Sequence, residues 1–219
     1  MNKIAATRAI VELDVTLLIA AGEISDDAVL TTACEAATRV IAVDGGVQHL
    51  RQLNIAPNII IGDLDSASDG DLVWGQENGS EIIRVKEQDS SDLAKALNLC
   101  NERQWPHIQI IGIEGGRMDH QLGSLASISN APNDLNIKAE LSDTILTRLT
   151  ANQNHKQNFS GIFSLFSFGQ SVVTLTGAEW NLENDIVTFS SKGLSNQCDG
   201  IINIEVHSGD SIILLTNKK

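Results

Sequence analysis

Five short, mostly apolar and β-branched runs recur in the first 130 residues, and each is followed by a segment with helical periodicity. The runs begin at Val15, Arg39, Asn58, Glu81 and His107. Because they are apolar almost throughout, rather than at every second position, we expect their strands to be covered on both faces, as in a parallel sheet wrapped by helices. This alternation predicts an N-terminal Rossmann-like α/β domain whose ligands bind at the carboxyl ends of the strands.

The pattern changes after the polar stretch that ends at Asp134. Helical periodicity fades, residues 162–168 alternate with period two, and further short apolar runs begin at Val172, Ile201 and Ser211. Turns that contain glycine separate these runs, which predicts a C-terminal antiparallel β-sandwich domain. We therefore expect an α/β domain over residues 1–134 and a β-sandwich domain over residues 135–219, with the polar segment 152–158 as a loop.

The chain has 219 residues and a formal net charge of -13. This length can bury a sizeable core, whereas the negative charge disfavours nonspecific binding to nucleic acid and to anionic membranes. The three cysteines are odd in number and dispersed, so they fit no closed disulfide framework and favour a reducing cytoplasm. No apolar run approaches the roughly 20 residues that cross a bilayer, and the run from Val15 to Ala21 is interpreted as a strand rather than the core of a signal peptide.

Carboxylates recur where the predicted strands end. Asp63 and Asp65 stand two residues apart directly after the apolar run 58–61, and Asp44, Asp92 and Asp119 follow other runs. The side chains of Asp63 and Asp65, two residues apart, can point at one Mg²⁺ ion, which takes few protein oxygens and keeps substrate phosphates in its coordination shell. Their recurrence predicts a single acidic cleft. Each aspartate also has a purely structural explanation, because Asp favours turns and helix N-termini.

Five sequence blocks combine these aspartates with glycines and a tryptophan. Four of them are Asp44-Gly-Gly46, Gly62-Asp-Leu-Asp-Ser66, Gln88-Asp-Ser-Ser-Asp92 and Gly115-Gly-Arg-Met-Asp-His120, and the fifth is Leu175-Thr-Gly-Ala-Glu-Trp-Asn-Leu182 followed by Gly193-Leu-Ser-Asn196. In order and approximate spacing they resemble the thiamine pyrophosphokinases, also called thiamine diphosphokinases, and the resemblance covers nearly the whole chain. Glu87 and Ser91 depart mildly from that family's pattern, in which Asp and Thr are usual.

This resemblance implies transfer of the diphosphate group of ATP to the hydroxyl of thiamine, giving thiamine diphosphate and AMP. It implies that Asp63, Asp65 and Asp92 hold Mg²⁺ and act in catalysis together with Arg117. The implied ATP-binding residues are Asp44, Gly45, Gly46, Gly115, Gly116, Arg117 and Asp119, and the implied thiamine-binding residues are Gln88, Trp180, Ser195 and Asn196. It also implies a homodimer whose active sites are shared between the subunits.

The residues themselves support phosphate chemistry without naming a substrate. The sequence has no Gly-x-x-x-x-Gly-Lys-Ser/Thr loop, so ATP would be held by metal and by glycine-rich strand ends. Arg117 follows two glycines and can donate bidentate hydrogen bonds to a phosphate, although a surface arginine beside a helix would look the same. Trp180 could stack on a cationic aromatic ligand, although an isolated Trp is more often a core residue. On these grounds a metal-dependent phosphohydrolase and a noncatalytic thiamine- or nucleotide-binding module remain as alternatives.

Overall fold

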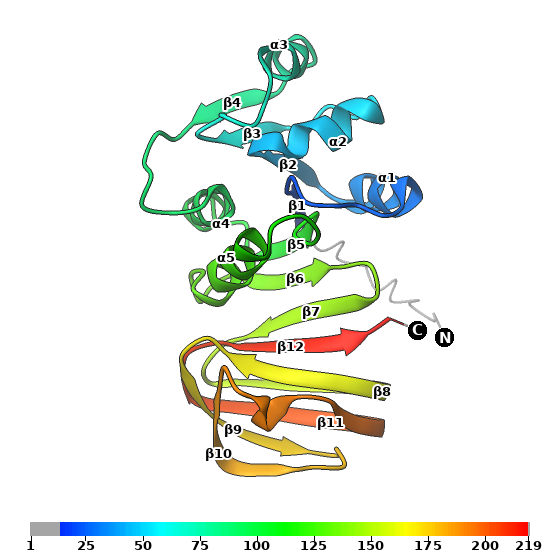
Figure 1. Cartoon of the computed structure of the whole chain (residues 1–219), viewed down its shortest axis with the longest axis vertical. Coiled ribbons are helices and arrows are strands. Elements are labelled where there is room, and N and C mark those ends of the chain that lie inside the picture. Colours follow the sequence, from blue (N-terminus) through cyan, green and yellow to red (C-terminus); the bar gives the residue numbers. More distant parts are fainter. Residues whose placement is uncertain (1–13, 219) are drawn as a thin grey trace, which may run out of the picture.

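The computed structural model describes residues 14–218, and the first 13 residues of the predicted α/β domain lie outside this range. Within it, twelve strands form one continuous hydrogen-bonded order that runs the length of the molecule (Figure 1). Six of them are parallel and lie in the order β6-β5-β1-β2-β3-β4. These are β1 (Val15–Ile19), β2 (Arg39–Val43), β3 (Ile59–Gly62), β4 (Glu81–Arg84), β5 (His107–Ile111) and β6 (Asn136–Glu140). The five apolar runs therefore form parallel strands, as predicted.

Five α-helices connect these strands and cover both faces of the parallel sheet. They are α1 (Asp27–Ala36), α2 (Val47–Gln52), α3 (Asp69–Glu77), α4 (Asp92–Glu102) and α5 (Met118–Ser129). In β1, Leu17 and Ile19 pack into one core with Leu30 of α1, whereas Leu18 packs into the opposite core with Leu97 of α4. Successive side chains of a strand point to opposite faces, so an almost continuous apolar run is what this two-sided burial requires.

The second half of the chain is antiparallel and has a core of its own. Its strands are β7 (Thr144–Leu149), β8 (Gln153–Ser167), β9 (Gln170–Thr176), β10 (Leu182–Thr188), β11 (Asn196–Gly209) and β12 (Ile212–Asn217). Phe163, Val187 and Ile204 lie in this separate core. The predicted change from a parallel α/β half to an antiparallel β half is confirmed. The sequence pattern did not predict that both halves share one hydrogen-bonded order.

Strand β6 joins the two halves. It pairs in parallel with β5 on one side and antiparallel with β7 on the other. The change of strand direction therefore lies between β6 and β7, and the domain boundary at residue 134 stays a prediction. No helix within residues 14–218 has the length and hydrophobicity that crossing a bilayer requires.

The polar segment 152–158 is not the loop that we expected, because all but its first residue lie in β8. Gln153, His155 and Gln157 pair across the ladder with residues of β11. Strand pairing uses backbone groups, so it does not need apolar side chains. The side chains of residues 153–158 alternate between half-buried and exposed positions, where polar groups remain solvated. Polarity alone was therefore a poor guide to backbone structure here.

Candidate active site

The predicted acidic blocks meet at the carboxyl edge of the parallel sheet. Asp44 follows β2, Asp63 follows β3, Asp92 begins the helix after β4, and Arg117 lies in the loop after β5. The carboxyl ends of parallel strands share one edge, so residues that are far apart in sequence converge there. This edge is the candidate active site of the α/β half.

Three carboxylates form a compact group at this edge. Asp44, Asp63 and Asp65 each place an oxygen within 4.8 Å of the others. Two residues in the loops that carry these carboxylates have a left-handed backbone, Asp44 with φ 46° and Leu64 with φ 63°. Such conformations are uncommon for residues other than glycine and are found where surrounding structure imposes them. Leu64, only 4% exposed, anchors the turn in the core and leaves its two flanking aspartates at the surface edge.

Hydrogen bonds orient the Asp63 carboxylate within this group. Its Oδ1 accepts the Asp65 backbone N–H at 3.2 Å, and its Oδ2 accepts Gln88 Nε2 at 3.1 Å. Desolvation raises the pKa of Asp63, but these hydrogen bonds and the charge of Lys95 outweigh it, so that pKa lies below its usual range. The carboxylate is therefore ionised at neutral pH, as a ligand for a hard divalent cation must be. Gln88, a predicted thiamine-binding residue, lies at the acidic group.

Asp92, the first residue of α4, contacts the turn formed by residues 63–65, here called the acidic turn. It is not one of the three clustered carboxylates. Its Oδ1 accepts the Asp63 backbone N–H at 3.0 Å and Lys95 Nζ at 2.9 Å. That oxygen is thus already shared by two donors. The predicted role of Asp92 as a metal ligand stays a prediction. Lys95 was not singled out from the sequence, although its position three residues after Asp92 on a helix was a visible signal.

The glycines of two predicted ATP-binding blocks allow close backbone approach. A Cβ on Gly46 would overlap the backbone of β1 at Ile19, so only glycine fits directly after Asp44-Gly45. Gly115 has φ 78°, and a Cβ there would overlap the side chain of Glu23. Both glycines let the backbone pack tightly against neighbouring parts of the chain at the sheet edge.

Arg117 and Asp119 form an exposed bidentate pair at the start of α5. Arg117 Nη2 and Nε donate to Asp119 at 2.6 and 3.1 Å, and the two side chains are 74% and 63% exposed. This pairing lowers the pKa of Asp119 and raises that of Arg117. Ion pairs this exposed are weak, so the guanidinium can exchange Asp119 for a phosphate at little cost.

The remaining predicted thiamine-binding residues lie together in the antiparallel half. Asn196, almost fully buried, accepts the Trp180 backbone N–H at 3.2 Å and donates to the Trp180 carbonyl at 2.7 Å. Ser195 has φ 57°, and its N–H donates to Ser164 Oγ at 3.0 Å. The Trp180 side chain itself is 57% exposed, which does not fit a core residue. Asn196 thus holds the Trp180 backbone while the indole stays available.

One chain does not bring these two groups of residues together. In the strand order, six strands separate β11, which begins at Asn196, from β2, which ends before Asp44. Neighbouring strands lie about 4.8 Å apart, so the seven spacings between β11 and β2 amount to roughly 34 Å along the sheet. In Figure 1 the acidic edge lies in the upper half of the molecule, and β9, β10 and β11 lie at its lower end.

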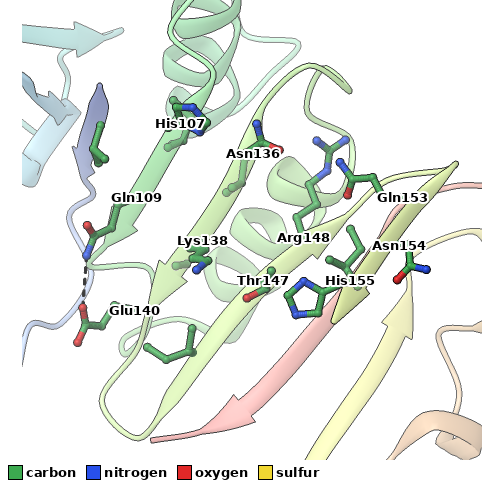
Figure 2. Close-up of a pocket in the computed structure, with 16 residues that line it drawn as sticks. His107, Gln109, Asn136, Lys138, Glu140, Thr147, Arg148, Gln153, Asn154 and His155 are labelled. Atoms are coloured by element: carbon green, nitrogen blue, oxygen red, sulfur yellow. Dashed lines mark hydrogen bonds between the residues drawn. The ribbon is translucent and has the colours of Figure 1, made fainter. Parts of the chain in front are cut away.

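A cavity of about 700 Å³ lies between these two regions and contains none of the predicted site residues. It opens on the face of the sheet formed by β5, β6, β7 and β8, and His107, Lys138 and His155 line it (Figure 2). Gln109 Nε2 donates to Glu140 at 3.4 Å within it. The volume of a cavity does not by itself identify a catalytic site, and the acidic edge carries the stronger chemical signal.

Comparisons with known proteins agree with the resemblance. The chain matches the family model described as "Thiamin pyrophosphokinase, catalytic domain" over residues 30–141 and the model described as "Thiamin pyrophosphokinase, vitamin B1 binding domain" over residues 148–213. Thiamine pyrophosphokinase of Bacillus subtilis is 30% identical over 166 residues, 69% of this chain and 73% of that protein. Thiamine pyrophosphokinase 3 of rice is 30% identical over 148 residues, 61% of this chain and 55% of that protein.

Solved structures show the same fold. The crystal structure of the Bacillus subtilis thiamine pyrophosphokinase superposes with a TM-score of 0.75 at 24% identity, covering 94% of this chain and 99% of that one. The Candida albicans thiamin pyrophosphokinase gives 0.77 at 16% identity, covering 95% and 90%. Because the catalytic-domain model alone spans more than half of the sequence and the acidic edge falls within it, this chain belongs to the thiamine pyrophosphokinase family.

Proposed function

We propose that this chain catalyses diphosphate transfer from ATP to the hydroxyl of thiamine, giving thiamine diphosphate and AMP. The observation that carries the proposal is the convergence of Asp44, Asp63 and Asp65 at the carboxyl edge of a sheet whose sequence matches the catalytic domain of this family. Three ionisable carboxylates whose oxygens lie within 4.8 Å of one another are a donor set that suits Mg²⁺. When bound, the cation would neutralise charge on the ATP phosphates.

The chain's own residues supply binding and orientation in this scheme. The glycines after Asp44 and before Arg117 let the nucleotide approach the backbone, and the Arg117 guanidinium binds phosphate oxygens. Asp119 holds Arg117 until a phosphate replaces it. Asp92 fixes the turn that carries Asp63 and remains a predicted ligand of the metal. Positioning and charge neutralisation account for most of the catalysis in phosphoryl transfer.

Thiamine binding requires Trp180, Ser195 and Asn196 of one subunit to face Gln88 and the acidic edge of another. The roughly 34 Å between the two groups within a chain supports this shared site. So does the exposure of Trp180, Leu194 and Ile162, which gives the antiparallel half an apolar surface that a partner would cover. The proposed enzyme is thus a homodimer. Its three cysteines, dispersed and odd in number, support a cytoplasmic location.

Product analysis tests the reaction. Purified protein is incubated with ATP and Mg²⁺, with and without thiamine, and AMP, phosphate and thiamine diphosphate are measured. AMP and thiamine diphosphate formed in equal amounts, and only with thiamine present, is the expected result. Phosphate released without thiamine would instead identify a phosphohydrolase, and thiamine binding without any turnover would identify a binding module.

Mixed dimers test the shared site. Asp65→Asn and Trp180→Ala chains are unfolded together, refolded and assayed at limiting thiamine. Random pairing makes roughly half of the dimers mixed, and each mixed dimer has one intact site, so roughly a quarter of all sites should recover. Native mass spectrometry confirms that chains have exchanged. No recovery despite exchange would show that each site is built within one chain.

A further inference from the structure

Lys95 is a buried cation at a place that disfavours one. Its side chain is only 4% exposed, although lysines are almost never fully buried unless they are paired. It also lies in the first turns of α4, where the helix dipole favours negative rather than positive charge. Burial and the dipole both oppose this residue, so the nearby carboxylates must offset them.

A chain of hydrogen bonds links Lys95 to the acidic turn. Lys95 Nζ donates to Asp92 Oδ1 at 2.9 Å, and the same oxygen accepts the Asp63 backbone N–H at 3.0 Å. Burial lowers the pKa of Lys95, but the hydrogen bond to Asp92 and the charges of Asp92, Asp63 and Glu87 outweigh it and raise that pKa. Lys95 is therefore a cation whose hydrogen bond to the acidic residues is made through Asp92.

We propose that Lys95 is a positioning residue of the metal site: it holds Asp92 so that Asp92 fixes the Asp63 backbone and aims Asp63 and Asp65 at the same point as Asp44. This inference rests on the proposed function, because it assumes that the three carboxylates bind a divalent cation. Lys95 touches neither that cation nor the substrates in this role. The positioning acts through the hydrogen bond to Asp92 Oδ1, whereas the charge of Lys95 also acts on Asp63 directly.

Whether removal of Lys95 strengthens or weakens metal binding distinguishes a positioning role for Lys95 from a purely electrostatic one. If Lys95 acted only as a nearby positive charge, removing it would strengthen the attraction of the carboxylates for a divalent cation. If it positions Asp92, removing it releases the turn and weakens binding. A role confined to folding would lower the melting temperature and leave metal affinity unchanged.

The test is a double-mutant cycle on Lys95→Met and Asp92→Asn, read out as Mn²⁺ binding to the nucleotide-free protein by electron paramagnetic resonance. We expect each single variant to raise the Mn²⁺ dissociation constant roughly tenfold, with the double variant no weaker than the worse single variant, because both act on one oxygen. Lys95→Met should also lower kcat and leave the KM for thiamine within about twofold. Lys138→Met, which removes the same charge at an exposed site away from the acidic edge, is the matched control.

Three results would overturn the proposal. They are tighter Mn²⁺ binding by Lys95→Met, unchanged binding, and fully additive losses in the double variant. Thermal melts show which variants are folded. If a single variant unfolds, Mn²⁺ binding by the double variant is compared with that of wild type, and unchanged binding overturns the proposal. The Mn²⁺ measurement does not depend on turnover, so failure of the wild type to make thiamine diphosphate would contradict the proposed function alone.

Discussion

Replacing Asp65 by asparagine should stabilise the metal-free protein while abolishing its response to Mg²⁺. Asp65 has an oxygen within 4.8 Å of oxygens of both Asp44 and Asp63. Two like charges at this separation repel by about 0.9 kcal/mol even at the dielectric constant of water, so removing Asp65 relieves about 1.7 kcal/mol over two pairs before salt screening. The exposed hydrogen bond from Ser66 Oγ can be kept by the asparagine oxygen.

The assay compares melting temperatures with and without Mg²⁺. Screening at physiological salt roughly halves this repulsion, so we expect the metal-free Asp65→Asn variant to gain about 1 kcal/mol, or roughly 2–4 °C for a chain of this size. Wild type should gain stability when Mg²⁺ is added, because a ligand that binds only the folded state stabilises it, whereas the variant should gain little and should form no AMP. Asp134→Asn, an exposed aspartate elsewhere, controls for the high net negative charge.

An unchanged or lower melting temperature in metal-free Asp65→Asn would refute the inference that the three carboxylates repel one another. Equal Mg²⁺ stabilisation of wild type and variant would refute the metal site itself. The two readouts are independent, so each part of the reasoning can fail separately. Repeating the melts at high salt should shrink the stabilisation, since screening weakens repulsion between exposed charges.

Three further outcomes follow from the same structure. Trp180→Ala should raise the KM for thiamine about 5- to 30-fold and leave the KM for ATP within about twofold, because stacking a cation on an indole contributes about 1–2 kcal/mol. Trp180→Phe should recover part of the loss. Steady-state kinetics in which both KM values rose equally would contradict this prediction. Asn196→Ala should lower the free energy of unfolding by about 2–3 kcal/mol, because the buried amide makes three hydrogen bonds to neighbouring backbone groups; a denaturant midpoint like that of wild type would be evidence against this. Desolvation raises the pKa of Asp71, but hydrogen bonds from Ser68 and Arg51 outweigh it and hold that pKa below 3.8. The ionised Asp71 carboxylate therefore stabilises the fold above about pH 4, and this stabilisation is lost as pH falls through the folded-state pKa. Asp71→Asn should therefore lower stability near neutral pH and flatten the acid decline in the free energy of unfolding, and a decline as steep as that of wild type would argue against this assignment.

Local patterns predicted the elements of the fold well where burial was uniform. The runs at Val15, Arg39 and His107 begin strands at those residues, because β-branched apolar residues covered on both faces leave an unambiguous signal. The signal failed for residues 153–158, which pair as part of β8 although their side chains are polar. Whether a polar segment becomes a strand depends on partner strands, and here the partner lies some 50 residues further along the chain.

The site shows the same division between local and nonlocal information. The sequence by itself determined the kinds of residue at the strand ends, the i, i+2 spacing of Asp63 and Asp65, and the family, because these properties are carried by residue types at short range. Only the tertiary structure decided that Asp44 joins that pair, that Asp92 hydrogen-bonds to a buried Lys95, and that Trp180, in the loop between β9 and β10, lies more than six strands from β2 and the acidic edge. The physical reason is that strand order and side-chain burial are set by contacts between distant segments, whose hydrogen bonds and packing leave no periodic trace in any one of them.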